Sequence, residues 1–400
     1  MHRFIILTIL LSLALAGNAH LYHFISLFLF FHFCITKVNP FILHCLFVSD
    51  GGSIGVNYGR IANNLPSAVK VVQLLKSQGL TRVKVYDTDP AVLRALSGSG
   101  IKVTVDLPNQ QLFAAAKAPS FASSWVERNV AAYYPHTQIE SIAVGNEVFV
   151  DPHNTTKFLV PAMKNIQKAL TKHNLDKDIK VSSPIALSAL ANSYPSSAGS
   201  FRPELVDPVF KPMLDFLRET GSYLMVNVYP FFAYESNADV ISLDYALFRD
   251  NPGVVDPGNG LRYYNLFDAQ IDAVFSALSA LKYDDVKIVV TETGWPSKGD
   301  SNEVGASVEN AAAYNGNLVR KIKLQAALDF AAGKGGSDCG PIQRGATCYD
   351  PNTLVAHASF AFNSYYQKQS RKGGSCYFGG TSYVVTQEPR YGSCEFPTGY

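Results

Sequence analysis

Two glutamates, each ending a β-prone run, are the strongest chemical signal in the sequence. Glu147 ends "SIAVGNE", and Glu292 lies in "IVVTETGWP". An ionised carboxylate is costly to bury unless it has a partner or a chemical role. Two carboxyl groups flanking a sugar bond carry out glycoside hydrolysis: one donates a proton, and the other attacks the anomeric carbon or activates water. The pair therefore predicts a site of this kind, with a structural ion pair as the competing interpretation.

The elements that must position these residues alternate regularly. Seven β-prone runs and amphipathic helical patterns follow one another from residue 54 to about residue 320, which predicts a parallel sheet of the α/β class. Five of the runs end next to polar or aromatic side chains: Asn57 and Tyr58, Tyr86 and Asp87, Asn146 and Glu147, Asn227 and Tyr229, and Glu292 and Trp295.

The strand ends favour a closed barrel over an open sheet. A (β/α)8 barrel gathers the C-terminal ends of all its strands into one pocket. A doubly wound sheet would favour a glycine-rich first turn, which "NYGRIANN" lacks. We therefore expect a TIM-type barrel over residues 51–322. Its eighth strand is missing, because the helical pattern "VENAAAYNGNLVRKI" runs directly into "KLQAALDF". A seven-stranded barrel would expose two sheet edges and lose one wall of its cleft.

The N-terminal region has the pattern of an export signal followed by an apolar insertion. Residues 1–19 combine a basic start, an apolar run and small residues, as secretory signals do. Residues 20–50 are also apolar, but the stretch without charge or proline is shorter than the roughly 20 residues that a membrane span needs. We expect this insertion to have no part in the fold. A membrane tether through residues 21–47 is the alternative, and a gene-model artefact is a further one.

Composition and motifs exclude several function classes. The net charge of +2 gives no electrostatic basis for binding nucleic acid or an anionic membrane. The nine histidines form no HExxH motif, and the cysteine spacing fits no zinc ribbon. Nucleotide-binding motifs are absent as well. We therefore expect no metal and no cofactor.

A second, smaller module is expected over residues 323–400. Past Gly333 the sequence becomes rich in Tyr, Phe and Gly and contains four cysteines, which is typical of a disulfide-containing module of an exported protein. "NTT" at Asn154 is an acceptor signature for N-glycosylation on a predicted loop. The C-terminal end carries no apolar tail that would signal a lipid anchor.

Five blocks of the sequence resemble plant glycoside hydrolase family 17, the endo-1,3-β-glucanases. They are "IGVNYGRIANNLPSA", "VKVYDTDPAVLRAL", "SIAVGNEVF", "MVNVYPFFAY" and "IVVTETGWPSKGD". The resemblance covers about residues 52–320 and implies a retaining mechanism, with carboxyl groups about 5 to 5.5 Å apart. It also implies that Glu147 is the acid/base and Glu292 the nucleophile. Asn146 would then hold the sugar 2-hydroxyl, and Tyr229 would lie near the nucleophile.

The same resemblance suggests which side chains line the glucan cleft: Asn57, Tyr58, Tyr86, Phe232 and Trp295. For Tyr86 and Phe232, simple packing is the alternative. The family also carries an eighth strand with a Phe-Asp-Glu-type segment, and this segment is absent here.

Residues 324–394 resemble carbohydrate-binding module family 43, a plant 1,3-β-glucan-binding domain, through "CGPIQ", "HASFAFNSYYQ" and "YGSC". The resemblance implies a Cys348–Cys394 disulfide. It leaves Cys339 and Cys376 without their usual partners, as thiols or paired with each other; Ala332 stands near where one such cysteine is expected. The aromatic residues Tyr365, Tyr366 and Phe378 are candidates for stacking on sugars, but we expect each of them to pack in the core of the module.

The sequence therefore suggests a secreted, monomeric endo-1,3-β-glucosidase of the cell wall, whose partner is 1,3-β-glucan and not nucleic acid or a membrane. A catalytically impaired 1,3-β-glucan-binding wall protein is the alternative.

Overall fold

Buried aliphatic runs form all seven parallel strands that the sequence predicts. The computed structural model describes residues 27–30, 53–151, 153–387 and 389–398. The strands of its main sheet are β1 (Leu27–Phe30), β2 (Ser53–Tyr58), β3 (Arg82–Val85), β4 (Lys102–Leu107), β5 (Gln138–Val144), β6 (Lys180–Ser182), β7 (Pro184–Ala186), β10 (Leu224–Asn227) and β13 (Ile288–Thr293). The predicted run "IKVSSPI" is divided here into β6 and β7, with Ser183 between them.

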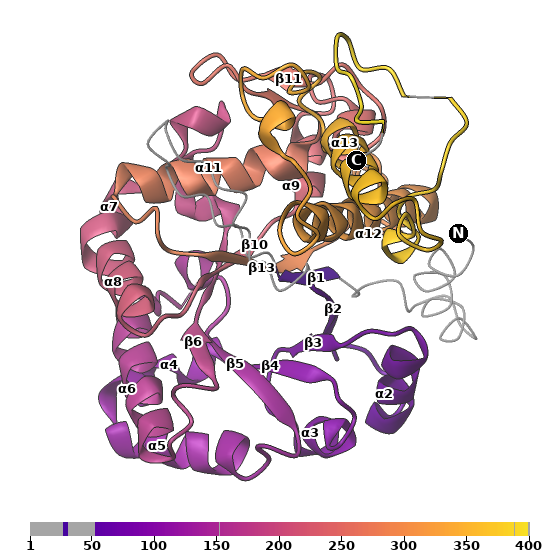
Figure 1. Cartoon of the computed structure of the whole chain (residues 1–400). Coiled ribbons are helices and arrows are strands. Elements are labelled where there is room, and N and C mark those ends of the chain that lie inside the picture. Colours follow the sequence, from indigo (N-terminus) through magenta and orange to yellow (C-terminus); the bar gives the residue numbers. More distant parts are fainter. Residues whose placement is uncertain (1–26, 31–52, 152, 388, 399–400) are drawn as a thin grey trace. The chain divides into compact units, whose positions relative to one another are not determined.

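These strands close into a ring. The order in the sheet is β6-β5-β4-β3-β2-β1-β13-β10-β7. The two end strands, β6 and β7, are consecutive in the chain; β6 pairs with β5, and β7 pairs with β10. One interrupted strand thus joins both ends of the sheet, and the predicted TIM-type barrel is confirmed (Figure 1).

Helices and short hairpins connect the strands, and several helices lie outside the sheet in Figure 1. The helices are α2 (Ala68–Ser77), α3 (Pro90–Leu96), α4 (Leu112–Lys117), α5 (Pro119–Val126), α6 (Leu159–Lys172), α7 (Pro203–Leu205), α8 (Lys211–Glu219), α9 (Pro230–Ser236), α10 (Leu243–Ala246), α11 (Leu266–Ala280), α12 (Val308–Ala332) and α13 (Leu354–Lys368). The hairpin strands are β8 (Leu190–Asn192) with β9 (Ser200–Phe201), and β11 (Val254–Val255) with β12 (Arg262–Tyr263).

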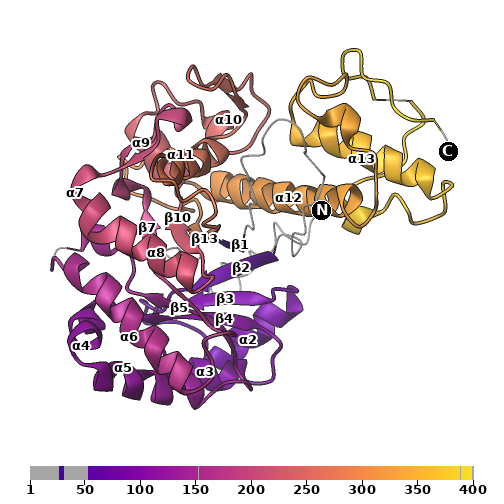
Figure 2. The same cartoon turned by 60° about the vertical axis from the view of Figure 1, so that its left-hand side comes forward.

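The place of the missing eighth strand is taken by β1. This strand lies between β2 and β13 in the sheet and runs antiparallel to β13 (Figure 2). The expectation of two open edges is therefore wrong, because backbone groups of β13 pair with β1. Four residues of the insertion expected to lie outside the fold thus take part in it. The rest of residues 20–50 and the predicted signal at 1–19 lie outside the described residues. In the described part of the chain, no helix is long and apolar enough to cross a membrane.

The chain divides into two compact units near the middle of helix α12. The first contains β1 and residues Ile54–Gly316, and the second contains the residues from Asn317 onward. The predicted continuity of "VENAAAYNGNLVRKI" with "KLQAALDF" is confirmed, because α12 is one uninterrupted helix.

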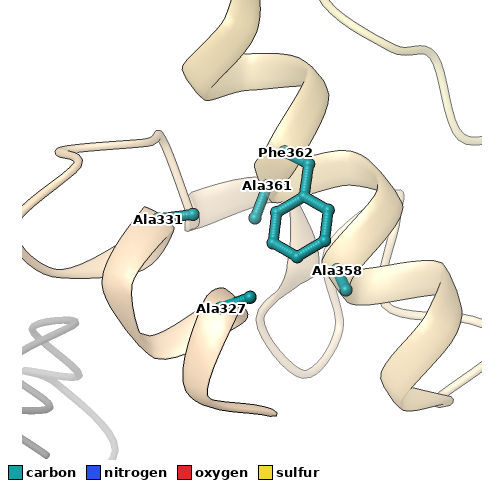
Figure 3. Packing of buried hydrophobic residues seen from close by; sticks show 5 residues of the cluster. All are labelled: Ala327, Ala331, Ala358, Ala361 and Phe362. Atoms are coloured by element: carbon teal, nitrogen blue, oxygen red, sulfur yellow. The ribbon is translucent and has the colours of Figure 1, made fainter. Parts of the chain in front are cut away.

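Small side chains let α12 and α13 pack closely within the second unit. Ala327 and Ala331 of α12 meet Ala358, Ala361 and Phe362 of α13 in a buried cluster (Figure 3). Alanine at these positions brings the helix backbones near one another and buries apolar surface.

Two of the aromatic candidates in this unit lie against the same cluster. The ring of Phe378 stacks on Phe362 with 4.1 Å between centroids, and Tyr365 lies 5.3 Å from Phe378. These contacts support the packing role of Tyr365 and Phe378, whereas Tyr366 is half-buried outside the cluster.

The predicted Cys348–Cys394 disulfide forms. Cys339 and Cys376 are not joined to each other and are present as thiols. Cys339 is buried in a cluster with Cys348 and Phe396, and Ala332 packs against that cluster. The expectation that Ala332 stands near the position of a missing cysteine stays a prediction.

We predict that Cys348→Ser destabilises the second unit. The disulfide closes a loop with a sequence separation of 46 residues, so its loss is expected to cost about 4 kcal/mol through the entropy of the unfolded chain. Thermal unfolding should show a lower midpoint for this variant. Cys376→Ser is the matched control, since Cys376 forms no disulfide; equal midpoints of the two variants would contradict the prediction.

Candidate active site

A tight turn after β5 presents Glu147. β5 ends at Val144, and Gly145 follows with φ 69°. A Cβ atom at Gly145 would lie 2.7 Å from Val148 and 2.8 Å from the side chain of Asn109, so only glycine fits. Glu147 itself has φ 49° and ψ 44°, a left-handed conformation that is unfavourable for a residue with a side chain. Such backbone strain is typical of functional sites.

A β-bulge in β13 directs Glu292. Val226 of β10 lies opposite Val290, but the next residue, Asn227, lies opposite Glu292. Thr291 is therefore an extra residue on β13. Bulges re-aim side chains next to active sites, and this one brings Glu292 to the same side of the sheet as Asn227.

A buried lysine is the direct partner of Glu292. Lys84 Nζ lies 2.7 Å from Glu292 Oε1, and the lysine side chain is fully buried. The same Nζ donates to Asn146 Oδ1 at 3.2 Å. The hydroxyl of Tyr229 donates to the second oxygen, Glu292 Oε2, at 2.8 Å. Both oxygens of Glu292 are thus held in place.

Asn227 is the corresponding partner of Glu147. Its Nδ2 donates to Glu147 Oε1 at 2.8 Å and lies 3.5 Å from Asn146 Oδ1. Its Oδ1 accepts a hydrogen bond from Thr291 at 2.8 Å, which fixes the orientation of the amide. One chain of hydrogen bonds therefore connects Glu147 to Glu292 through Asn227, Asn146 and Lys84.

Asn146 is fixed by a second asparagine. Asn109 donates from Nδ2 to the Asn146 carbonyl at 2.9 Å, and its Oδ1 accepts from the Asn146 amide at 2.8 Å. This reciprocal pair holds the turn between β5 and Glu147 against the loop after β4.

The environment of Glu147 favours its protonated form. Burial raises the pKa of Glu147, and the negative charge of Glu292 raises it further. The hydrogen bond from Asn227 and the charge of Lys84 act in the opposite direction. A carboxyl whose pKa is raised by burial can donate a proton near neutral pH.

Most of the other predicted cleft residues lie at the same end of the barrel. Asn57 is buried at the end of β2, and Tyr58 beside it is half-buried, with a pKa raised by burial. The Tyr86 ring has its centroid 4.7 Å from Lys84 Nζ. Phe232 is 59% exposed and lies 5.5 Å from the Tyr229 ring, which leaves a flat apolar face accessible.

Trp295 is packed among other side chains, unlike the exposed ring of Phe232. Its side chain is only 5% exposed and packs against Phe231 and Tyr314. The indole N–H donates to the Gly305 carbonyl at 2.9 Å. This placement favours packing behind the site over contact with a sugar. Asn154, the predicted glycosylation acceptor, is exposed on the loop after Glu147.

Lys84 was not among the sequence-predicted site residues, and Asn227 was expected only as a polar side chain at a strand end, with no role in the site. Lys84 is the central charge of "RVKVYD", and Asn227 interrupts "LMVNV". A polar or charged side chain within a strand that is buried on both faces is the signal that could have found them. In the described residues, no group of three or more His, Cys, Asp or Glu side chains is placed to hold a metal ion.

Comparison with known proteins places this barrel in a family. The family described as glycosyl hydrolases family 17 matches residues 54–335. The chain belongs to this family. Residues 315–383 match the X8 domain, which confirms the predicted carbohydrate-binding module. The chain is therefore a glycoside hydrolase by family, with an appended module.

Several relatives are similar over most of their length. Glucan endo-1,3-beta-glucosidase 3 of Arabidopsis thaliana is 39% identical, over 88% of this chain and 86% of the relative. Glucan endo-1,3-beta-D-glucosidase of Olea europaea is 35% identical, over 86% of this chain and 93% of the relative. The solved structure of a beta-1,3-glucanase and allergen of Cryptomeria japonica pollen is 45% identical with a TM-score of 0.63, and covers 66% of this chain and 82% of its own.

We predict that Lys84→Met destabilises the first unit by about 3–5 kcal/mol, because Glu292 is left as a buried charge without its partner. Urea unfolding at neutral pH measures this effect. The double variant Lys84→Met/Glu292→Gln should regain part of the loss, since it removes both charges.

Lys211→Met is the matched control for this prediction. Lys211 pairs with Asp207 on an exposed helix surface, where removal of an ion pair costs about 1 kcal/mol or less. Equal losses for the buried and the exposed lysine would contradict the importance of the Lys84–Glu292 pair.

Proposed function

We propose that this protein is an endo-hydrolase of 1,3-β-D-glucosidic bonds in 1,3-β-glucans and that it retains the anomeric configuration. The observation that carries the proposal is the hydrogen-bonded chain joining Glu147 to Glu292 at the mouth of a family 17 barrel. The relatives named as glucan endo-1,3-beta-glucosidases support the substrate.

Glu292 is the proposed nucleophile. Its carboxylate attacks the anomeric carbon, the bond from that carbon to the leaving oxygen breaks, and a covalent glucosyl ester forms. Lys84 and Tyr229 suit this role because they hold both oxygens of the carboxylate in place.

Glu147 is the proposed acid/base. It gives its proton to the leaving oxygen in the first step, and in the second it takes a proton from the water that attacks the ester. Its raised pKa supplies the protonated form at the start of the cycle. Asn227 holds the same carboxyl by a hydrogen bond, so the group keeps its position in both protonation states.

The glucan chain is proposed to run across the residues around this pair. Asn146, fixed by Asn109, is placed to bind a hydroxyl of the reacting sugar. Phe232 offers an exposed ring for stacking, and Tyr86 borders the site beside Lys84, with Tyr58 at the end of β2 as a further candidate.

The X8 module is proposed to hold the enzyme on insoluble 1,3-β-glucan. A tethered module raises the local concentration of substrate at the catalytic cleft. The Cys348–Cys394 disulfide and the glycosylation signature at Asn154 support an exported protein of the cell wall. We propose that it acts there as a monomer.

A non-catalytic glucan-binding protein is the second candidate. It is favoured by one observation: β1 is antiparallel to β13, where a TIM-type barrel has a parallel eighth strand. Turnover separates the two candidates, since a binding protein would retain insoluble 1,3-β-glucan without releasing reducing sugar.

We predict that azide distinguishes the roles of the two glutamates. In Glu147→Ala, hydrolysis of laminarin should fall by about 10²–10⁴-fold, and with an aryl β-laminaribioside azide should replace water in the second step to give the β-laminaribiosyl azide. In Glu292→Ala, azide should occupy the nucleophile's position and give the α-laminaribiosyl azide. Mass spectrometry and NMR identify the products.

Glu219→Ala, an exposed change at the end of α8, is the control for this assignment and should keep full activity. If Glu147→Ala gave the α-azide and Glu292→Ala gave the β-azide, the two proposed roles would be reversed. Wild-type protein that binds glucan and releases no sugar would favour the second candidate.

We predict that Asn227→Ala moves the alkaline fall of activity to higher pH. Activity requires protonated Glu147, so kcat/KM should fall as pH rises through the pKa of this group. Asn227 lowers that pKa by donating to Glu147, and its removal therefore raises it. The pH profile of kcat/KM on laminarin measures the shift; a shift to lower pH would contradict the assignment of Glu147.

A further inference from the structure

A second buried carboxyl group, Asp106, lies inside the barrel and has no role in the mechanism above. It is on β4 and is only 2% exposed. Lys84 lies opposite Thr104 in the register of β3 and β4. Asp106 is two residues beyond Thr104, so it points to the same face of the sheet as Lys84. Its own neighbour in register is Ala143, which packs in a buried cluster with Met225 and Val289 of two other strands.

Asp106 receives no hydrogen bond on its buried oxygen. Among the described residues, Asp106 Oδ1 has no hydrogen-bond partner. The nearby ammonium of Lys84 has three donors, and these face Glu292, Asn146 and the Tyr86 ring. A carboxylate in an apolar interior needs donors or a cation of its own. The surroundings therefore favour the neutral acid.

The charged groups around Asp106 act in both directions. Burial raises the pKa of Asp106 to about 8, the charge of Lys84 opposes this rise, and the charges of Glu292 and Asp87 add to it. Lys84 and Asp87 belong to β3 and the loop after it, and Glu292 belongs to β13, while β5 contributes only Ala143 in register. Asp106 is therefore mainly protonated below about pH 8, and it lies near Lys84, which holds Glu292.

We propose that Asp106 is a positioning residue of the active site: while it carries its proton, Glu292 is the one carboxylate paired with Lys84 in the described residues, and when the proton leaves to solvent, Asp106 becomes a second anion that competes for Lys84 and lowers activity. This inference rests on the proposed role of Glu292 as nucleophile. It adds a group that acts through Lys84 without touching the substrate.

The alkaline side of the pH profile tests this proposal. Loss of the Glu147 proton lowers kcat/KM by about tenfold per pH unit. Above about pH 8, ionisation of Asp106 should steepen the fall to about a hundredfold per pH unit, since two protons are then required. Asp106→Asn should be active and keep the shallower fall at all alkaline pH values. A role in folding alone would change the amount of active enzyme but not this slope.

Glu140→Gln is the matched control for the slope. Glu140 is a half-buried carboxyl that pairs with Arg82 at 3.2 Å and Lys102 at 4.0 Å. This variant should keep the steeper fall of the wild type. Equal slopes for wild type and Asp106→Asn would overturn the proposal.

Unfolding as a function of pH tests Asp106 without requiring activity. The folded state keeps a proton on Asp106 that the unfolded chain releases above about pH 4. The contribution of Asp106 to the free energy of unfolding is therefore fully present below about pH 4 and is lost as pH rises towards about 8. Asp106→Asn should remove that part of the decline. If wild type and Asp106→Asn lose stability equally as pH rises, the proposal for Asp106 is overturned, even if the enzyme is active. If the two curves differ as expected but the wild type has no activity, the result counts against the proposed hydrolase and not against Asp106.

Discussion

One ammonium group buried between strand ends organises the mouth of this barrel. Lys84 is fully buried, so its charge is tolerated only if all its donors find partners. They find Glu292, Asn146 and the Tyr86 ring. This demand fixes three elements at once: β3, the turn after β5 and the bulge in β13. The position of Glu147 follows, because Asn146 is its neighbour and Asn227 bridges both.

Much of this arrangement could be predicted from the sequence. Runs such as "KVTVDL" and "IAV" are buried on both faces, so parallel strands follow from composition and length, and their C-terminal ends mark the site. Glu147 and Glu292 were found in this way. Lys84 was missed because a lysine within a strand is usually on an edge or on the surface. Only the closed ring of strands shows that this one is buried.

Other features have no local signal in the sequence. The bulge at Thr291 depends on the pairing of β13 with β10, which are about 60 residues apart in the chain. The insertion of β1 beside β13 depends on a vacant position in the sheet, and no property of "LFLF" specifies it. The burial of Trp295 also required the fold, since its neighbours come from α9 and α12.

The extra residue in β13 has a genetic consequence. Loss of one codon at Thr291 would leave the following glutamate opposite Asn227, but it would remove the buried hydroxyl that donates to Asn227 Oδ1, so the amide that holds Glu147 would lose its fixed orientation. A single in-frame deletion is thus a short evolutionary route from a family 17 hydrolase to a lectin-like descendant that recognises its polysaccharide but leaves it intact.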